Sequence, residues 1–432
     1  MEDRSNRYCI VGAGPSGLAT AREFARAGIP FDVLERHGDV GGIWNLENGK
    51  SPMYESAHFI SSKTLSAFDD FPMPHAYPDY PGWRLILGYI RAFALEHDLR
   101  RHIEFGADVE HASPENGGWH VQLSDGEERR YRGVLAAAGH NWDPVMPDYA
   151  GEFTGNTYHA FRYKSAEEFR GKRVLIVGGG NSGCDIACDA ANSASRAFIS
   201  LRRGYHFLPK HILGKPTDVF FRSGPEPPAW LAQPLLALLL RVLVGDLTRY
   251  GLPRPDHKVL ASHPIMNTQL LHYLAHGDIV PKPDVRELRG DRVSFADGSE
   301  EQIDVIVYAT GYTPAIPFLG KSLSTVSSDL FLNIFPRGHR ELFLVGHFET
   351  DGGAFPIVSK QAKLIAALTR ARMSNVQAAV AFERKQLGPP PDLSGGIRYI
   401  KSPRHSNYVQ FEAYGHYLDR ALKELEKTGS VA

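Results

Sequence analysis

The stretch GKRVLIVGGGNSGCDIACDAANSASRAFISLRR, residues 171–203, decides the fold. Its apolar run 173–177 predicts a buried strand, and a helix follows. Between the two stand three glycines at the spacing Gly-x-Gly-x-x-Gly: Gly178, Gly180 and Gly183. The first glycine permits a tight turn, the second lets the backbone approach a pyrophosphate, and the third lets helix and strand pack closely. The stretch therefore predicts a unit that binds a dinucleotide.

The end of the next strand indicates which dinucleotide this loop binds. The strand 197–201 leads into Arg202 and Arg203, close to the position where an acidic residue would contact a free ribose. Two guanidinium groups there can bind a 2′-phosphorylated ribose through charge-assisted hydrogen bonds. We therefore expect NADPH at this loop, and the alternative is that both arginines form a solvated charged face.

An earlier copy of the unit, RYCIVGAGPSGLATAREFARAGIPFDVLER, occupies residues 7–36. Its strand 8–11 leads into the same glycine spacing and an alanine-rich helix. The glycines of this copy are Gly12, Gly14 and Gly17. The next strand, 31–34, ends at Glu35, whose carboxylate can accept hydrogen bonds from ribose hydroxyls. This order of features predicts a second nucleotide site, suited to a cofactor with an unmodified ribose.

Each unit is closed by a later apolar strand. YRGVLAAAGHNWDP (131–144) returns to the first unit, and IDVIVYATGYTPAI (303–316) returns to the second. Two nucleotide sites in one chain are typical of a bound flavin that faces a nicotinamide. The predicted fold class is α/β, with two dinucleotide-binding, Rossmann-like domains and the NADPH domain inserted into the FAD domain.

The order of these parts predicts the domain boundaries. We expect the first part of the FAD-binding domain at residues 1–166 and its return part at 309–432. The NADPH-binding domain is expected between them, at 167–308, with a helical insertion at about 209–278.

Composition narrows the function classes. The 432 residues carry a formal charge of −1, which gives no reason to expect nucleic acid as a partner. Three cysteines provide no disulfide framework, and the N-terminus enters a strand pattern at once, so we expect a cytoplasmic protein without a signal peptide.

The apolar segment 230–247 is interrupted by Pro234, Arg241 and Asp246, so we expect a packing helix rather than a membrane anchor. Residues 418–432 read as a charged helix.

A segment without periodicity, FTGNTYHAFRYK (153–164), precedes the second glycine loop. It fits the pattern Phe-x-Gly-x-x-x-His-x-x-x-Tyr, and here the sequence resembles the flavin-containing monooxygenases. Further motifs extend the resemblance over nearly the whole chain: GAGPSG (12–17), GGIWN (41–45), FDDFPMP (68–74), GGGNSG (178–183), YGLPRPDHKVLASHPIMN (250–267), YATGY (308–312) and GGAFPIVSKQAK (352–363). In the related Baeyer–Villiger enzymes a tryptophan followed by proline or aspartate ends the fingerprint, where this chain has Tyr163 and Lys164. The resemblance implies that the segment is a linker against the cofactor cleft.

The resemblance also implies FAD at the first fold and NADPH at the second. The residues expected to bind FAD are Gly12, Gly14, Pro15, Ser16, Gly17, Glu35, Ile43, Trp44, Ser61 and Gln361. Those expected to bind NADPH are Gly178, Gly180, Asn181, Ser182, Gly183, Arg202 and Arg203. The catalytic candidates are Ser61, His159 and Tyr163, although the chemistry is that of the flavin and we expect His159 and Tyr163 to act by positioning. No metal is expected, because no ligand spacing such as HExxH occurs.

The sequence departs from the family pattern at one position. Members with the motif NSSK carry an asparagine that reaches the flavin edge, whereas FISSKTLSAFDDFPMP (59–74) places Ile60 there. Ser61 is the substitute candidate, and the alternative is an ordinary loop serine. Cys184 and Cys188 lie four residues apart on a helix, outside any CxxC spacing, so we expect them to pack in the core.

The resemblance implies a soluble, bacterial-type monooxygenase that depends on NADPH and O2. Such an enzyme uses a C4a-hydroperoxyflavin to oxygenate the nitrogen of an amine or the sulfur of a sulfide in a small molecule. Two alternatives stay open: Baeyer–Villiger oxygenation of a ketone, and a redox-sensing module that holds FAD and NADPH without oxygen transfer, which Ile60 keeps in consideration. A homodimer is also left open.

Overall fold

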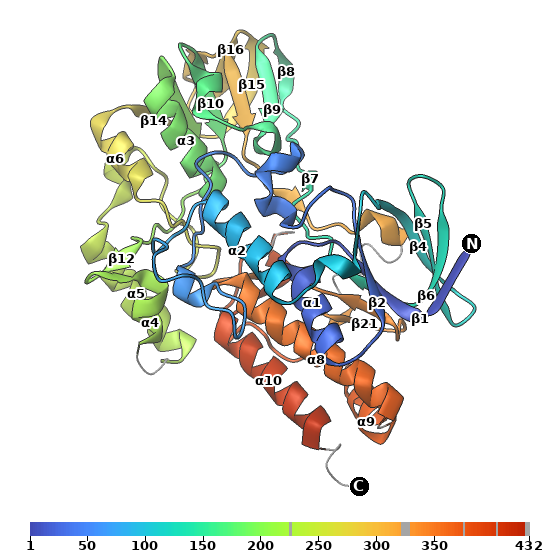
Figure 1. The fold of residues 1–432 in the computed structure, drawn as a ribbon. Coiled ribbons are helices and arrows are strands. Elements are labelled where there is room, and N and C mark those ends of the chain that lie inside the picture. The colour runs from blue at the N-terminus through green and yellow to red at the C-terminus, as the bar shows by residue number, and fades with distance from the viewer. Residues whose placement is uncertain (224–226, 321–328, 375, 403–404, 428–432) are drawn as a thin grey trace.

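Two separate sheets each carry one of the glycine loops (Figure 1). The structure is a computed structural model, and it describes residues 1–223, 227–320, 329–374, 376–402 and 405–427. The larger sheet has the strand order β3-β2-β1-β6-β5-β4, and β22 also pairs with β6. The second sheet has the order β14-β11-β10-β18-β9, and a smaller sheet, β17-β16-β15-β8, lies beside it at the top of Figure 1.

The first sheet consists of β1 (Glu2–Val11), β2 (Phe31–Glu35), β3 (Ile103–Phe105), β4 (Val109–Glu115), β5 (Gly118–Leu123), β6 (Glu128–Ala136) and β22 (Leu342–Leu344). The second consists of β9 (Asn156–His159), β10 (Arg173–Val177), β11 (Arg196–Ser200), β14 (Ile279–Lys282) and β18 (Val305–Tyr308). The smaller sheet contains β8 (Ala150–Phe153), β15 (Val285–Gly290), β16 (Arg292–Phe295) and β17 (Glu300–Gln302). The helices are α1 (Pro15–Arg26), α2 (Trp83–Glu96), α3 (Asn181–Ser193), α4 (Thr217–Arg222), α5 (Ala229–Leu243), α6 (Gln269–His276), α8 (Ala354–Ser374), α9 (Val376–Gln386) and α10 (Phe411–Lys427).

The two glycine units are built alike, as predicted. β1 pairs in parallel with β2 and with β6, and β10 pairs in parallel with β11 and with β18. Parallel strands need helices on both faces, which explains the uninterrupted apolar runs 8–11 and 174–177, all of them buried. The α/β fold class with two dinucleotide-binding folds is therefore confirmed, and the strands predicted to close the units are β6 and β18.

The C-terminal part of the chain returns to the first sheet. β22 pairs in parallel with β6, and α8 packs against α1 on one side and α10 on the other. Figure 1 shows α8 and α10 side by side below the first sheet, next to α1. α10 covers most of the predicted C-terminal helix, whose residues 428–432 lie outside the described residues.

The segment before the second glycine loop is more regular than predicted. Asn156–His159 forms β9, which pairs in parallel with β18 from Asn156 opposite Val305 to His159 opposite Tyr308. β9 lies at the edge of its sheet, and only His159 of its four residues is buried. Such a short edge strand does not show the two-residue alternation by which a strand is recognised in a sequence.

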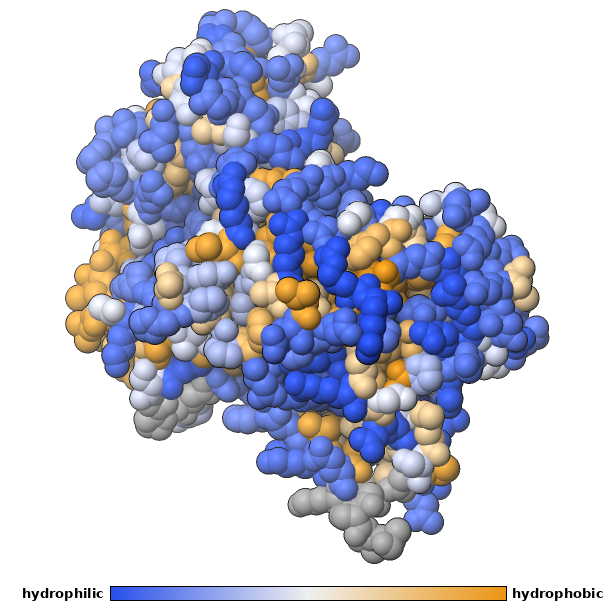
Figure 2. Space-filling model, in the orientation of Figure 1, coloured by the Kyte–Doolittle hydropathy of each residue, from blue (hydrophilic) through white to orange (hydrophobic). Residues whose placement is uncertain are grey.

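The predicted packing helix of the insertion is α5, and it packs through one face only. Leu236 and Leu240 are buried, whereas the side chains of Trp230, Leu238 and Val242 are 76%, 62% and 76% exposed. The apolar surface at the left of Figure 2 coincides with the place of α4 and α5 in Figure 1. In the described part of the chain, no helix is long and apolar enough to cross a membrane.

Candidate functional site

The first glycine loop closes tightly on its own backbone. A Cβ atom at Gly12, where φ is +104°, would lie 2.8 Å from the carbonyl oxygen of Ala137, and one at Gly17 would lie 1.8 Å from the carbonyl oxygen of Gly12. No side chain fits at either position. Pro15 begins α1 directly after the loop, so the unpaired N–H groups and the positive dipole end of the helix are available to a phosphate.

A second loop packs against the first and forms a cradle with it. A Cβ atom at Gly14 would lie 3.4 Å from Cα of Gly42, and one at Gly42 would lie 3.0 Å from Cα of Gly14. Ile43 and Trp44 follow directly, and the Trp44 ring meets the ring of Phe59 edge to face at 4.9 Å. The structure thus brings together three residues predicted at the FAD site, Gly14, Ile43 and Trp44.

Glu35 lies at the carboxyl end of β2, beside the first loop. Its side chain is buried, and its two carboxylate oxygens accept hydrogen bonds from the backbone N–H groups of Ala13, at 2.6 Å, and His37, at 2.9 Å. Burial raises the pKa of Glu35, and the two N–H donors oppose that shift because they stabilise the carboxylate. Each oxygen keeps a second lone pair with which it can accept a hydrogen bond from a ribose hydroxyl.

Gln361 connects α8 to α10 and to the segment after β22. Its amide oxygen accepts the N–H of Gly346 at 2.8 Å, and its amide nitrogen donates to the hydroxyl of Tyr414 at 2.7 Å. A Cβ atom at Gly346 would lie 2.2 Å from Oγ of Ser16. Gln361 therefore holds the backbone next to Ser16, and both ends of its side chain already have partners within the protein.

The second glycine loop repeats the geometry of the first. A Cβ atom at Gly178, where φ is +116°, would lie 2.4 Å from the carbonyl oxygen of Ala309, and one at Gly183 would lie 2.1 Å from that of Gly178. A Cβ atom at Gly180 would meet nothing within 4 Å. The side of the loop at Gly180 is thus open, as the approach of a pyrophosphate requires.

Two further residues predicted at the NADPH site have different surroundings. Asn181 uses its amide to join α3 to the insertion: the nitrogen donates to the carbonyl oxygen of Pro264 at 3.2 Å, and the oxygen accepts the N–H of Met266 at 2.9 Å. Ser182 is exposed in the first turn of α3. Asn181 therefore ties the second loop to the motif 250–267, a role that the sequence did not reveal.

Arg202 and Arg203 follow β11 on the side of the second loop. Arg202 is exposed and Arg203 is half-buried, with its guanidinium carbon 5.9 Å from the centre of the Tyr205 ring. The same Tyr205 ring packs on the loop, because a Cβ atom at Gly179 would lie 2.8 Å from it. The structure thus places Arg203 beside the glycine loop, and the exposed Arg202 precedes it directly in the chain.

The fingerprint segment joins the two folds. The hydroxyl of Tyr163, which is fully buried and stacked on Phe169, donates to Asp189 of α3 at 2.8 Å. The Lys164 ammonium donates to the backbone carbonyl oxygens of Ser51, Met53 and, at 3.0 Å, Phe161. These contacts tie residues of the first fold to the second, which explains the position of the segment directly before the glycine loop.

The ring of His159 is uncharged and is held in place by contacts within the protein. Its Nδ1 accepts the N–H of Phe161 at 3.1 Å, and its ring lies edge to face with Tyr312 at 5.1 Å. Burial lowers the pKa of His159 to about 4. At neutral pH the ring therefore carries no charge, and burial also raises the pKa of Tyr163, which stays protonated.

The loop that begins at Ile60, where the sequence departs from the family pattern, has an apolar and a polar side. Ile60 packs against a cluster formed by Leu208 and the insertion residues Leu236, Leu240, Val259 and Met266. The Ser61 hydroxyl forms a hydrogen bond with that of Ser66 at 2.7 Å, whereas Oγ of Ser62 is fully buried and has no partner among the described residues. Ser62 is thus the serine with unused hydrogen-bonding capacity, although the sequence pointed to Ser61.

A buried carboxylate that sequence reasoning missed lies where the two folds and the insertion meet. Asp185 of α3 accepts hydrogen bonds from the hydroxyl of Tyr54, at 3.1 Å, and from the amide of Asn267, at 2.6 Å. Burial raises its pKa. Tyr54 belongs to the first fold and Asn267 to the insertion, so Asp185 joins three parts of the chain. Only Asn267 carried a signal in the sequence, as the last residue of a motif.

Cysteines and acidic residues form no further centre in the described ranges. Cys9, Cys184 and Cys188 are buried free thiols, and the latter two pack in the core around α3, as expected. Burial raises the pKa of Cys188 to about 12, which keeps its thiol protonated. No group of three or more His, Cys, Asp and Glu side chains in these ranges is arranged to hold a metal ion.

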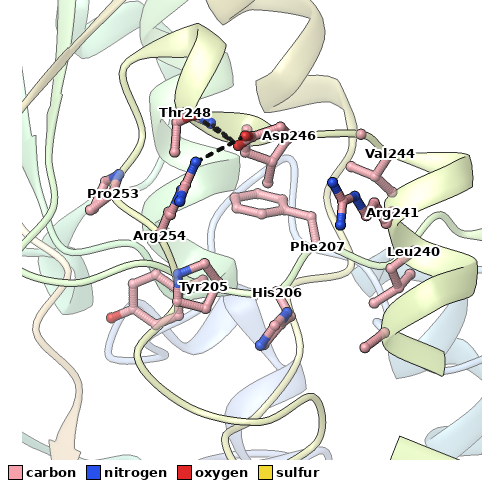
Figure 3. Close-up of a pocket in the computed structure, with 14 residues that line it drawn as sticks. Tyr205, His206, Phe207, Leu240, Arg241, Val244, Asp246, Thr248, Pro253 and Arg254 are labelled. Atoms are coloured by element: carbon pink, nitrogen blue, oxygen red, sulfur yellow. Dashed lines mark hydrogen bonds and ion pairs between the residues drawn. The ribbon is translucent and has the colours of Figure 1, made fainter. Parts of the chain in front are cut away.

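A cavity of about 180 Å³ lies next to the second loop, between the segment after β11 and the end of α5 (Figure 3). Its walls include Tyr205 and Phe207 on one side, and on another Leu240 of α5 and Val244, the residue directly after that helix. Two insertion residues complete it, Asp246 and Arg254, which Figure 3 shows joined by a dashed line.

Comparison with known proteins decides the family. The model of the family described as "Flavin-binding monooxygenase-like" matches residues 5–376. The chain belongs to this family. It is 36% identical over 327 residues to the probable indole-3-pyruvate monooxygenase YUCCA9 of Arabidopsis thaliana, covering 72% of this chain and 76% of that protein. It is 34% identical over 394 residues to dimethylaniline monooxygenase [N-oxide-forming] 2 of Rattus norvegicus, covering 83% of this chain and 72% of that protein.

The fold also matches a solved structure, that of cyclohexanone monooxygenase from Rhodococcus sp. Phi1 bound to NADP+. The TM-score is 0.73 at 16% identity, and the match covers 99% of this chain and 98% of that one. The chain is thus a flavin-dependent monooxygenase of the two-dinucleotide fold, with FAD and NADPH as its cofactors. The two glycine loops fit two bound dinucleotides: Gly12, Gly17, Gly178 and Gly183 leave no room for a side chain, and the second loop is open at Gly180.

Proposed function

We propose that this flavin-dependent monooxygenase oxygenates a soft nucleophile, the nitrogen of an amine or the sulfur of a sulfide, in a small molecule. The observation that carries the proposal is the end of the fingerprint, where Tyr163 and Lys164 stand in place of the tryptophan and following proline or aspartate of the Baeyer–Villiger enzymes. Tyr163 binds α3, and Lys164 binds the backbone of residues 51–53. The N-oxide-forming relative, at 34% identity, supports it.

We propose the following roles for the residues that would hold the cofactors. The backbone of Gly12, Gly14 and Gly17 and the start of α1 receive the FAD pyrophosphate, and Glu35 accepts hydrogen bonds from its ribose. The second set of glycines receives the NADPH pyrophosphate at the start of α3, with Arg202 and Arg203 on the 2′-phosphate. When bound, the two cofactors supply hydride transfer and oxygen activation.

The contribution of the chain is to orient the cofactors and exclude water. Aromatic rings line up beside the Gly14 cradle: Trp44 meets Phe59, and Phe59 meets Phe355 at 5.6 Å. Such a wall keeps water from a reactive oxygen species and so limits peroxide release. We propose that the buried hydroxyl of Ser62, which has no partner among the described residues, donates a hydrogen bond inside the site.

No side chain is needed as a general acid or base in this proposal. The neutral His159 accepts a backbone N–H, and the Tyr163 hydroxyl is committed to Asp189. We therefore assign both residues positioning roles. Ser61, bound to Ser66, holds the shape of its loop.

We also propose the domain division expected from the sequence, 1–166, 167–308 and 309–432, with the insertion at about 209–278. Strand pairing supports it, since β22 of the last part returns to the first sheet. A cytoplasmic location and a small-molecule substrate with O2 as co-substrate belong to the same proposal.

A carbonyl substrate is the second candidate. The relative with the highest identity reported above is named for indole-3-pyruvate, a 2-oxo acid, and the matching solved structure is named for a ketone. Oxygenation of a ketone or 2-oxo acid would use the same two cofactor sites and differ in the substrate pocket. Carbonyl substrates are therefore tested in the same experiment.

The test is a substrate panel run with the purified flavoprotein and NADPH. Dimethylaniline, an aryl methyl sulfide, cyclohexanone and indole-3-pyruvate are compared for NADPH oxidation, oxygenated product and released peroxide. We expect an N-oxide or sulfoxide as the main product. Product from the carbonyl compounds alone would move the assignment to the second candidate, and peroxide without any product would favour the non-oxygenating redox module.

A further inference from the structure

A turn of the insertion lies directly against the chain that follows the two phosphate-site arginines. A Cβ atom at Gly204 would lie 2.3 Å from the carbonyl carbon of Arg254 and from the carbonyl oxygen of Pro253, and 2.4 Å from the nitrogen of Pro255. Gly204 is the residue after Arg203. The absence of a side chain at Gly204 therefore allows the backbone of Arg254, fifty residues further along the chain, to lie against the residue that follows Arg203.

The side chain of Arg254 is exposed and loosely held. It is 78% exposed, and its guanidinium makes one ion pair, at 3.4 Å, with the carboxylate of Asp246. That carboxylate already accepts the backbone N–H of Thr248, at 3.0 Å, and its hydroxyl, at 2.8 Å. Figure 3 shows Arg254 pointing from the wall of the cavity toward Asp246. An exposed pair of this kind contributes little stability, so Arg254 can leave it at small cost.

The position of Tyr205 places this group relative to the cofactor loop. The Tyr205 ring packs on Gly179 of the second loop, lies 5.9 Å from the guanidinium carbon of Arg203, and lines the same cavity as Arg254. Two segments thus bring three arginines to the region after β11: Arg202 and Arg203 follow the strand in the chain, and the backbone of Arg254 packs on Gly204. A phosphate dianion has three oxygens that each accept more than one N–H, so it can bind several guanidinium groups at once.

We propose that Arg254, supplied by the insertion, is a third residue that binds the 2′-phosphate of NADPH, and that Asp246 competes with the phosphate for it. The inference rests on the proposed placement of the 2′-phosphate at Arg202 and Arg203. Binding of the cofactor exchanges the Asp246–Arg254 pair for a phosphate–Arg254 pair and fixes the turn 246–255 of the insertion. The insertion then discriminates between NADPH and NADH.

The test measures binding of two ligands that differ only in the 2′-phosphate, 2′,5′-ADP and 5′-AMP, to the FAD-loaded protein by calorimetry. Arg254→Ala is expected to raise the Kd of 2′,5′-ADP about tenfold, the size of one lost charge-assisted hydrogen bond, and to leave that of 5′-AMP within about twofold. Arg254→Lys, which keeps the charge but not the planar fork, should give an intermediate value.

The opposite effect is expected when the competitor is removed. Asp246→Asn keeps an oxygen for the Thr248 N–H but no longer pairs with Arg254, so the Kd of 2′,5′-ADP should fall about two- to fivefold. Arg249→Ala is the matched control, because Arg249 is an exposed arginine of the same turn whose guanidinium contacts Tyr250. It should change neither Kd by more than about twofold.

Three outcomes overturn the inference. They are an unchanged Kd of 2′,5′-ADP in Arg254→Ala, equal weakening of both ligands, and weaker binding of 2′,5′-ADP by Asp246→Asn. The double variant Arg202→Ala, Arg203→Ala separates this inference from the proposed function. If that variant loses the preference for 2′,5′-ADP while Arg254→Ala keeps it, Arg202 and Arg203 bind the 2′-phosphate and Arg254 does not. If the wild type shows no preference for 2′,5′-ADP, the proposed phosphate site fails as well.

Discussion

Contacts between glycine backbones set the dimensions of the proposed FAD site. Gly14 and Gly42 approach each other so closely that each would place a Cβ atom 3.0–3.4 Å from the other's Cα. Gly42 also has a φ of +56°, which favours glycine. At this scale the site consists of backbone, and its polar side chains, such as Glu35 and Gln361, hold that backbone in place.

Gly14→Val should yield colourless protein, because the valine methyl groups would fill the cradle at Gly42 and keep the backbone from the pyrophosphate. Flavin content per protein, measured from the absorbance spectrum, is expected to fall by at least about tenfold. Gly38→Val is the control, since a Cβ atom there meets nothing within 4 Å. Normal flavin content in Gly14→Val would refute the assignment of the first loop.

Ile60→Asn should lower the share of NADPH oxidation that ends as peroxide, because asparagine brings a hydrogen-bond donor to the expected flavin edge. The substitution also removes apolar contacts with the cluster of Leu208, Leu236, Leu240, Val259 and Met266, so we expect a loss of about 1–2 kcal/mol in stability. The ratio of peroxide to NADPH, measured with a good amine or sulfide present, reports the effect. Ile60→Val, which adds no donor, should leave the ratio unchanged. A wild type that already releases no peroxide would show that Ile60 is not a source of uncoupling.

The buried ring of His159 should make stability depend on pH. Its folded pKa of about 4 lies below the ordinary value of about 6.5, so the unfolded chain binds a proton more readily. The stabilising effect is therefore complete above about pH 6.5 and is lost as the pH falls toward 4. We expect the melting temperature to drop between pH 7.5 and pH 5, and to drop less in His159→Gln. His347, whose pKa burial also lowers to about 4, should keep part of the dependence. An equal drop in wild type and variant would contradict this account of His159.

The glycines were predictable because each has a task fixed by neighbours in the sequence. Gly12, Gly17, Gly178 and Gly183 close turns between a strand and the helix that follows it. The tasks of Asn181 and Gln361 could not be read in the same way, since their partners Pro264 and Tyr414 lie 83 and 53 residues away in the chain. Asn181 was expected to contact NADPH, and its amide is bound to the insertion.

At the scale of elements, the fingerprint segment and α3 form the joint between the two folds. Tyr163 reaches α3 through Asp189, and Asp185, one turn earlier on the same helix, reaches Tyr54 and Asn267. The strands β1 and β10 could be recognised from uninterrupted apolar runs, but β9 could not, because an edge strand of four residues leaves no pattern. The contacts across the joint depend on tertiary structure and carry no local signal.

Tyr163→Phe should destabilise the protein by about 1–2 kcal/mol, because it removes a hydrogen bond to the half-buried carboxylate of Asp189. Among the described residues, Asp189 then keeps the Ser56 hydroxyl as a side-chain donor. The same variant should keep its flavin and its product, since Tyr163 has no catalytic role in the proposal. Tyr273→Phe removes an exposed hydrogen bond from α6 to α3 and is expected to cost less than about 0.5 kcal/mol. Thermal unfolding followed by flavin fluorescence compares the two. Loss of oxygenation with unchanged stability in Tyr163→Phe would instead indicate a catalytic role.

At the scale of the whole molecule, the chain interrupts one nucleotide fold with another and then completes the first. This order was predictable because the two glycine units and their return strands, β6 and β18, each carry a strong local pattern. The walls of the substrate site were not predictable, since no motif of the sequence marks them. The exposed apolar face of α5 likewise appears only in the folded chain.

The measurement that tests the central claim most directly is the fate of labelled oxygen in a single reaction. The flavoprotein is supplied with NADPH, 18O2 and dimethylaniline or an aryl methyl sulfide, and the product is examined by mass spectrometry. The account predicts an N-oxide or sulfoxide that contains one 18O atom, with one NADPH consumed per product. NADPH oxidation that yields only labelled peroxide, with no labelled product from any member of the panel, would contradict it.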